Sequence, residues 1–217
     1  MAPEAWIKKW LTVISSKTVM ELRGIPCLTL EEAAPNKKAI CVSRSFSKDV
    51  YSLDSLNGYI SSYVARAAEK LRGQKSVCQY LQAFIWTNPH NGLPKYYGID
   101  GIDLTPPTAD TSQLIRAATG LLKRVYRPEF SYKKAGVILS GLGVEKFKQE
   151  DLFNEPYQDS RRQTLMNVVD KYNLDVNSGK LFWAAEGTSR AAWQMRQYHR
   201  SPRYTTRWDE LLKVKTG

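Results

Sequence analysis

The chain has 217 residues, and its 32 Lys and Arg outnumber its 21 Asp and Glu, which gives a formal charge of +11. A hydrophobic content of 42% is enough to build folded cores and excludes a wholly disordered protein. No stretch approaches the roughly 18 apolar residues of a transmembrane helix. The three cysteines are widely spaced and include no C-x-x-C pair, which argues against disulfides or a cysteine-based zinc site. We therefore expect a cytoplasmic protein without a membrane partner.

Residues 3–23 have Trp, Ile and Leu mostly at spacings of three and four, with one irregularity around Ser15 and Ser16, which predicts a helical segment that ends at Gly24. This segment is too short to be a domain, so its apolar face requires a partner. We expect Trp6 and Trp10 to be exposed or loosely docked, and rapid proteolysis before residue 35 would support this expectation. Residues 25–36 are predicted to be extended and loop-like.

The middle of the chain alternates between strand and helix patterns. The predicted elements are a strand at 39–46, a helix at 53–72, strands at 77–88 and 96–104, a helix after the N-cap Asp110 and a strand at 132–142. This β-α-β-β-α-β order is the split βαβ pattern of an α+β fold. Two helices would cover one face of a four-stranded sheet, and the other face would stay free.

Alternation within the second predicted strand assigns its side chains to two faces. One face is expected to hold Val77, Leu81 and Ile85, and the other Cys78, Tyr80, Phe84 and Trp86. After a polar linker at 146–162, residues 163–172 are predicted to be helical and 181–185 to be a strand. The predicted domains are thus 1–36, 37–145 and a small α+β domain at 163–217, with 146–162 between the last two.

Positive charge is spread along the chain, with +3 in residues 1–44, +4 in 45–145 and +4 in 146–217. Mildly basic folded segments suit a surface that follows a phosphate backbone. Cations and small hydroxyl side chains that suit successive phosphates gather around the first predicted strand, at Lys37, Lys38, Ser43, Arg44 and Ser45. The alternative is an ordinary strand edge protected by lysines.

Patterns for catalysis are missing from the sequence, which has no Gly-rich phosphate loop and no H-E-x-x-H motif. His90 and His199 are 109 residues apart in polar surroundings. Asp100 and Asp103 form a carboxylate pair that suits Mg²⁺, although a solvated turn is the commoner reason for such a pair. We expect no catalytic residue, metal or cofactor.

Two further segments carry binding chemistry. Gln149, Asp151, Leu152 and Phe153 form a compact peptide in which Leu-Phe can enter an apolar pocket while the amide makes hydrogen bonds. The alternative is that Leu152 and Phe153 pack back onto the sheet. Residues 190–208 interleave five Arg with aromatic residues, which suits phosphates and bases or, alternatively, a small aromatic core.

Taken together in order, seven stretches resemble the C-terminal half of UmuC-type proteins, the catalytic subunits of bacterial DNA polymerase V in the Y family of translesion polymerases. The stretches are CVSRSF at 41–46, YVARAAEKLR at 63–72, YYGIDG at 96–101, LTPPTADT at 104–111, YKKAGVIL at 132–139, QEDLF at 149–153 and SPRYTTRWDELLKV at 201–214. The resemblance covers essentially the whole chain. It implies a thumb remnant and tether at 1–36, a little-finger domain at 37–145 and the family's small C-terminal domain at 163–217.

The resemblance also implies partners. The little finger lies on duplex DNA beside the primer–template junction, so the preferred contacts become Lys37, Lys38, Ser43, Arg44 and Ser45. Residues 149–153 resemble the family's sliding-clamp peptide, with Glu150 where the usual form has Leu. Family members also work with a processed accessory dimer and with the recombinase filament.

The implied function is that of a DNA-binding and clamp-binding part of a polymerase that bypasses lesions during the SOS response. In this family the metal-binding carboxylates and the nucleotide pocket lie in the palm and fingers, N-terminal to the thumb. We therefore expect this chain alone not to incorporate nucleotides. The alternative is a non-catalytic interaction protein that occupies the sliding clamp or the accessory subunits.

Overall fold

The computed structural model describes residues 3–10, 12–27, 35–88, 90, 92, 94–144, 160–175, 181–187 and 200–214. The chain forms two compact units, Met1–Asn36 and Lys37–Gly217. None of the helices in these described ranges is long and apolar enough to cross a membrane.

The N-terminal unit contains two helices, α1 (Glu4–Trp10) and α2 (Val13–Leu22). The expectation of one helix over 3–23 was wrong, because Thr12 has extended backbone angles and begins a new helix. Its hydroxyl oxygen accepts a hydrogen bond from the backbone N–H of Ser15 at 3.2 Å, which satisfies one of the free donors at the start of α2. The side chains of Trp6 and Trp10 are exposed.

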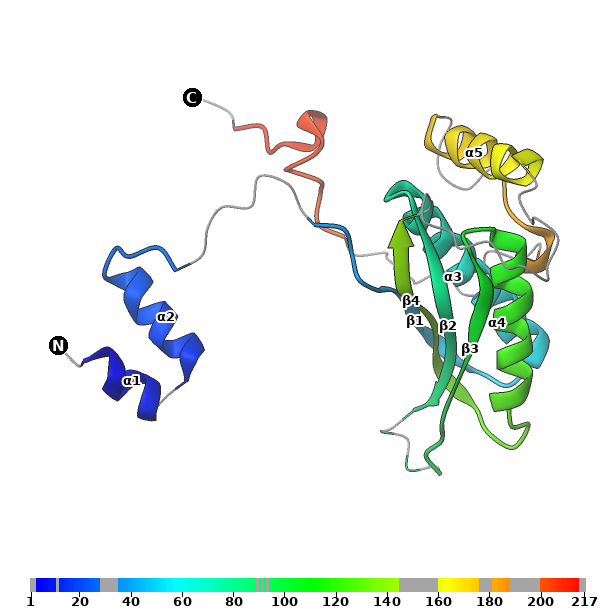
Figure 1. Cartoon of the computed structure of the whole chain (residues 1–217), viewed down its shortest axis with the longest axis horizontal. Coiled ribbons are helices and arrows are strands. Elements are labelled where there is room, and N and C mark those ends of the chain that lie inside the picture. Colours follow the sequence, from blue (N-terminus) through cyan, green and yellow to red (C-terminus); the bar gives the residue numbers. More distant parts are fainter. Residues whose placement is uncertain are drawn as a thin grey trace. The chain divides into compact units, whose positions relative to one another are not determined.

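The second unit contains a four-stranded sheet and two long helices. These elements are β1 (Ile40–Val50), α3 (Leu53–Gly73), β2 (Ser76–Thr87), β3 (Tyr97–Thr108), α4 (Thr111–Val125) and β4 (Tyr132–Val144). The strands are ordered β1-β4-β2-β3, and each neighbouring pair is antiparallel. Helices α3 and α4 lie on the same side of the sheet (Figure 1). The predicted α+β class is confirmed.

Local chemistry explains where the helices begin. The Ser52 hydroxyl accepts a hydrogen bond from the N–H of Ser55, and the Asp110 carboxylate accepts one from the N–H of Gln113 at 2.9 Å. Strand β3 runs past the predicted end at Leu104 and includes two prolines. It is an edge strand, where a residue without a backbone N–H is tolerated.

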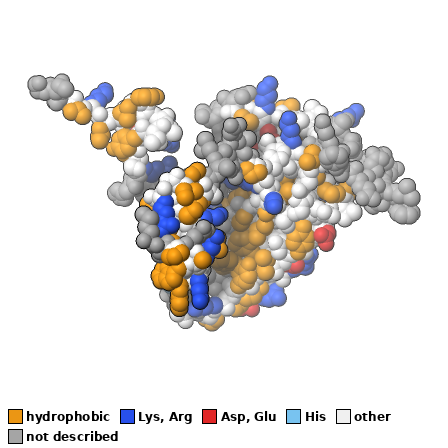
Figure 2. Space-filling model, turned by 60° about the vertical axis from the view of Figure 1, so that its left-hand side comes forward, with side chains coloured by type: hydrophobic (Ala, Val, Ile, Leu, Met, Phe, Trp, Pro, Cys, Tyr) orange, Lys and Arg blue, Asp and Glu red, His pale blue; other side chains and the backbone are white. Residues whose placement is uncertain are grey.

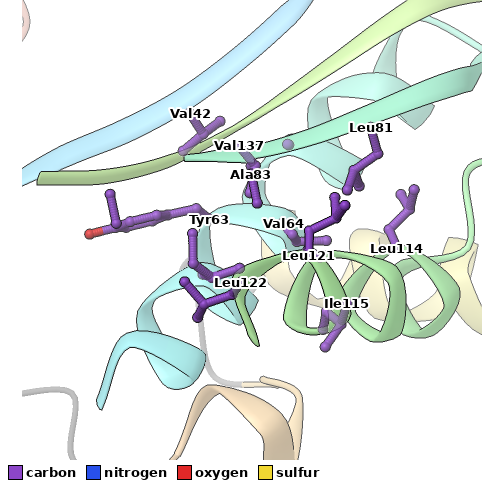
Figure 3. Packing of buried hydrophobic residues seen from close by; sticks show 14 of the residues in the cluster. Val42, Tyr63, Val64, Leu81, Ala83, Leu114, Ile115, Leu121, Leu122 and Val137 are labelled. Atoms are coloured by element: carbon purple, nitrogen blue, oxygen red, sulfur yellow. The ribbon is translucent and has the colours of Figure 1, made fainter. Parts of the chain in front are cut away.

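The hydrophobic core lies between the sheet and the two helices. Figure 3 shows Leu81, Ala83 and Val137 pointing from the strands toward Val64 of α3 and Leu121 of α4. All five side chains are fully buried. The helical side of the sheet is therefore closed by apolar packing, and α3 and α4 do not cover the opposite side.

The predicted orientation of Cys78 was wrong. The pairing register shifts between Cys78 and Tyr80, and such an irregularity moves the preceding side chains to the other face. Cys78 consequently joins Leu81 in the core, whereas Val77 is buried outside that cluster. Simple alternation through the whole of β2 does not hold.

The described C-terminal residues form helix α5 (Ser160–Asp175) and two 3-10 turns, η2 (Ala184–Glu186) and η3 (Trp208–Glu210). The expected strand at 181–185 was wrong. Both backbone polar groups of Leu181 pair with the side-chain amide of Asn173, at 3.1 and 3.0 Å, so this backbone is satisfied without a neighbouring strand. The described C-terminal ranges contain no strand.

The C-terminal segment docks against the helical layer. Asp170 of α5 receives two hydrogen bonds from the Arg72 guanidinium, at 2.6 and 2.7 Å. Trp183 packs against the core cluster, and a Cβ on Gly58 of α3 would lie 3.2 Å from the carbonyl oxygen of Glu186. Residues of α5 and η2 thus add to the cover on the helical side, away from the other face of the sheet.

Candidate nucleic-acid interface

The side of the sheet away from α3 and α4 is called the open face. Cross-strand pairing places its side chains in rows that run from β1 through β4 and β2 to β3. Two neighbouring rows are Ser45–Lys134–Trp86–Tyr97 and Ser43–Gly136–Phe84–Ile99. Because paired residues point to the same side, each row brings together residues that are distant in sequence.

Three aromatic side chains and one cation meet near the β2–β3 turn, and Phe84, Trp86, Tyr97 and Lys134 are called the aromatic corner. The Trp86 ring lies 5.5 Å from that of Phe84 and 5.1 Å from that of Tyr97, measured between centroids. The Lys134 ammonium lies 4.7 Å from the Trp86 centroid, a cation–π contact. Trp86 is 38% exposed and Tyr97 54% exposed, so both rings remain partly accessible.

Glycine allows this corner to form. A Cβ on Gly136 would collide with the Phe84 ring and would lie 2.5 Å from the Cβ of Ser43. The Phe84 ring occupies that space and is nearly buried although it belongs to the open face. Phe84 therefore forms a floor beside the more exposed rings of Trp86 and Tyr97.

The residues predicted to bind phosphates do not share one face. Lys37 and Lys38 are exposed just before β1, where the backbone of Lys37 exchanges two hydrogen bonds with the Gln74 side chain. Ser43 and Ser45 lie on the open face. Figure 2 shows Lys and Arg side chains interspersed with hydrophobic ones on the surface of the protein.

Arg44 points to the helical side of the sheet, because its register partner Ala135 is a core residue. The guanidinium is nevertheless exposed and acts electrostatically on Tyr63. Burial raises the pKa of the Tyr63 hydroxyl above its usual range, and the positive charge of Arg44 opposes that rise. The structure thus separates Arg44 from the serines on either side of it.

The two carboxylates considered for Mg²⁺ are also separated. Asp100 pairs with Ala83 and Asp103 with Tyr80, and these positions lie on opposite faces. The Arg124 guanidinium donates a 2.5 Å hydrogen bond to Asp100, which lowers the pKa of that carboxyl with help from the Gly101 N–H. Within the described residues, no group of three or more His, Cys, Asp and Glu is suitably placed for a metal ion.

Several predicted positions lie outside the described residues: Gln149, Asp151, Leu152 and Phe153 of the peptide, and His199. His90 is exposed. Among the C-terminal arginines, the Arg207 guanidinium forms an ion pair with Glu210 at 3.3 Å, and the backbone N–H of Arg203 donates a hydrogen bond to the same carboxylate. These contacts lower the pKa of Glu210.

Sequence reasoning did not select Trp86, Tyr97 and Lys134 for the candidate interface. Trp86 was assigned to a face, but its neighbours belong to other strands and are defined only by register. The sequence signal that could have indicated this interface is the presence of Trp86 and Tyr97 on two predicted strands and of Lys134 on the predicted strand 132–142. Such a signal is weak without the strand order β4-β2-β3.

The fold and the open face define an α+β domain in which helices cover one side of an antiparallel sheet and polar, basic and aromatic residues occupy the other. Residues 37–152 match the impB/mucB/samB family C-terminal domain, and residues 163–214 match a domain of unknown function. The chain belongs to the impB/mucB/samB family.

Similar proteins support this membership. Protein UmuC of Salmonella typhimurium strain LT2 is 40% identical over 96% of this chain and 50% of its own length. Protein SamB of Salmonella typhimurium is 36% identical over 99% of this chain and 50% of its own length. Protein MucB of Escherichia coli is 37% identical over 94% of this chain and 48% of its own length. The chain spans about half the length of each of these relatives.

Proposed function

We propose that the chain acts as the DNA-binding and clamp-binding part of a UmuC-type translesion polymerase. The observation that carries this proposal is the open face, which combines hydroxyl and aromatic side chains with Lys134 while both long helices lie on the other side. Membership of the impB/mucB/samB family supports the same role.

The open face suits a grip on backbone phosphates. Lys37 and Lys38 supply charge at one end, and the hydroxyls of Ser43 and Ser45 supply donors along β1. Within β1, Ile40 and Ser45 are five positions apart, which is about 17 Å of strand. This length matches roughly five base pairs along a duplex strand. Contacts to phosphates carry no sequence information, so binding of this kind tolerates many sequences.

The clamp contact is proposed for Gln149, Asp151, Leu152 and Phe153. Leu152 and Phe153 would enter an apolar pocket of the sliding clamp, and Gln149 would make hydrogen bonds at its rim. The accessory dimer and the recombinase filament are proposed as further partners from the family resemblance.

Fluorescence anisotropy of a labelled primer–template, titrated with the purified chain at several salt concentrations, tests the DNA contact. Each neutralised phosphate contributes about −0.9 to the slope of log K against log salt, and we expect a slope equivalent to roughly three to six phosphates. Replacing Lys37 and Lys38 with Glu should weaken binding and flatten the slope. Lys123→Glu, an exposed position on α4, is the matched control.

Absence of binding at low salt would contradict the DNA contact. The alternative function, an interaction protein that only occupies the clamp or the accessory subunits, predicts that charge reversal at Lys37, Lys38 and Arg44 changes no activity in cells. Loss of clamp binding in Leu152→Ala with Phe153→Ala would support the peptide contact in either case.

A further inference from the structure

The aromatic corner differs in chemistry from the rest of the open face. Tyr97 is 54% exposed and Trp86 38% exposed, and both belong to the β2–β3 hairpin close to its turn. Exposed apolar rings that adjoin one another form a patch, and such patches often mark binding sites. The Tyr97 and Trp86 rings meet edge to face, at 70°, so they present surfaces in two directions.

Electrostatics narrows the class of ligand. The Lys134 ammonium is held over Trp86, so a positive charge lies within the apolar surface. The carboxylate of Asp103 also lies on the open face, but its register partner is Tyr80. Tyr80 is six residues along β2 from Trp86, so this carboxylate lies away from the corner. A purely apolar partner would bury the ammonium without compensation. A ligand with both a flat ring and an anion satisfies both features.

We propose that the aromatic corner binds unpaired bases of single-stranded DNA, with a base against Tyr97 or Trp86 and a phosphate near Lys134. Bases inside a duplex are already stacked on their neighbours, whereas an unpaired base offers a free face to an aromatic side chain. Four-stranded sheets with helices behind them use such rings to stack bases in other nucleic-acid-binding domains. This inference rests on the proposed function, in which the open face lies on DNA.

The position of the aromatic corner on the open face suits a junction between duplex and single-stranded DNA. Lys37 and Lys38 precede β1 at one end of the open face. Ser45, about 17 Å along β1 from Ile40, shares a row with the corner. Duplex phosphates at the lysine end and unpaired bases at the corner would let one face hold both sides of a duplex–single-strand junction. The corner would then favour DNA with a single-stranded overhang over blunt DNA of the same duplex length.

The test compares three labelled ligands by anisotropy: a blunt duplex, the same duplex with a single-stranded overhang, and the overhang as a free oligonucleotide. For the wild-type chain we expect the overhang to tighten binding about tenfold, the scale of one base stacked on an aromatic ring. Tyr97→Leu and Trp86→Leu should remove most of that gain and weaken binding of the blunt duplex much less. Tyr51→Leu, at a 63% exposed tyrosine in the β1–α3 connection, is the matched control.

The outcomes separate this inference from the proposed function. Binding of the blunt duplex with no gain from the overhang would overturn the inference and leave the proposed grip intact. Equal losses on all ligands in Tyr97→Leu, with a native circular dichroism spectrum, would also overturn it. Binding of the free oligonucleotide but not of the blunt duplex would support the corner and contradict the duplex grip. Binding of none of the ligands would overturn both.

Discussion

Gly136 determines how closely the Phe84 ring approaches β4. A Cβ at this position would collide with the Phe84 ring, which is 5% exposed, and with the Cβ of Ser43. We expect Gly136→Ala to lower the free energy of unfolding by about 1–3 kcal/mol, the usual cost of overpacking. Urea unfolding followed by circular dichroism measures this change.

Gly120 provides the control for that substitution. It lies within α4, and a Cβ there would have no atom within 4 Å. Gly120→Ala should therefore raise the free energy of unfolding by about 0.5–1 kcal/mol, because alanine favours the helix more than glycine does. Equal destabilisation by both substitutions would contradict the role assigned to the space above Gly136.

The cysteines of the sheet differ in environment and should differ in reactivity. Cys41 is exposed on β1, whereas Cys78 is fully buried, and burial raises the pKa of its thiol to about 12. At pH 8 iodoacetamide should modify Cys41 and leave Cys78 untouched in the folded chain, since the thiolate is the reactive form. Mass spectrometry of the peptides reads out both sites.

The raised pKa of the Cys78 thiol predicts that the free energy of unfolding falls at alkaline pH. The ordinary pKa of a cysteine thiol is 9.0. As the pH rises above this pKa, the Cys78 thiol stays protonated in the folded state, whereas it loses its proton in the unfolded chain. The contribution of Cys78 to stability is thus complete below about pH 9 and declines toward pH 12. Cys78→Ala should flatten this alkaline decline, and a decline of the same steepness would contradict the assignment.

At the scale of elements, α5 is held to the helical layer by ion pairs. Arg72 and Asp170 are 13% and 19% exposed, and Arg162 forms a second pair with Asp110. We expect Asp170→Asn to weaken the docking of α5 by about 1–3 kcal/mol, because a charged hydrogen-bonded pair loses one partner. Hydrogen exchange should rise in α5 and stay unchanged in the central strands. Asp209→Asn, an exposed carboxylate, controls for the change in net charge.

Periodicity in the sequence was sufficient for most elements of the second unit. The helix α3 and the strands β2 and β4 agree with the predicted ranges within two residues, and α4 begins directly after the predicted N-cap Asp110, because their apolar residues face a single core. Prediction failed at Leu181, where a β-prone stretch is bonded to the Asn173 side chain. It also failed at Cys78, where an irregularity in pairing reverses the alternation.

The candidate interface was less predictable than the elements that carry it. Ser43 and Ser45 were selected from composition and do lie on the open face, but their neighbour Arg44 does not. Trp86 and Lys134 are 48 residues apart in sequence, and their contact depends on β4 lying next to β2. Strand order is a property of long-range pairing, which local patterns do not encode.

At the scale of the whole molecule, the two compact units should respond separately to protease. Brief digestion should cut before residue 35 and leave a fragment that begins near Lys37, where the second unit starts. Deletion of residues 1–36 should change the free energy of unfolding of the second unit by less than about 0.5 kcal/mol. Protection of the N-terminal unit at protease levels that digest the sheet would contradict this independence.

The sheet order has a consequence for how the domain is made on the ribosome. Among the four strands of the described sheet, β1 is synthesised first but pairs with β4, which is synthesised last. Until residues 132–144 have left the exit tunnel, β1 has no partner and the β2–β3 hairpin lacks its other neighbour. Because β4 lies between β1 and β2, the sheet is completed in a single late step. Shorter nascent chains expose to other proteins the edges of β1 and β2 that β4 later covers.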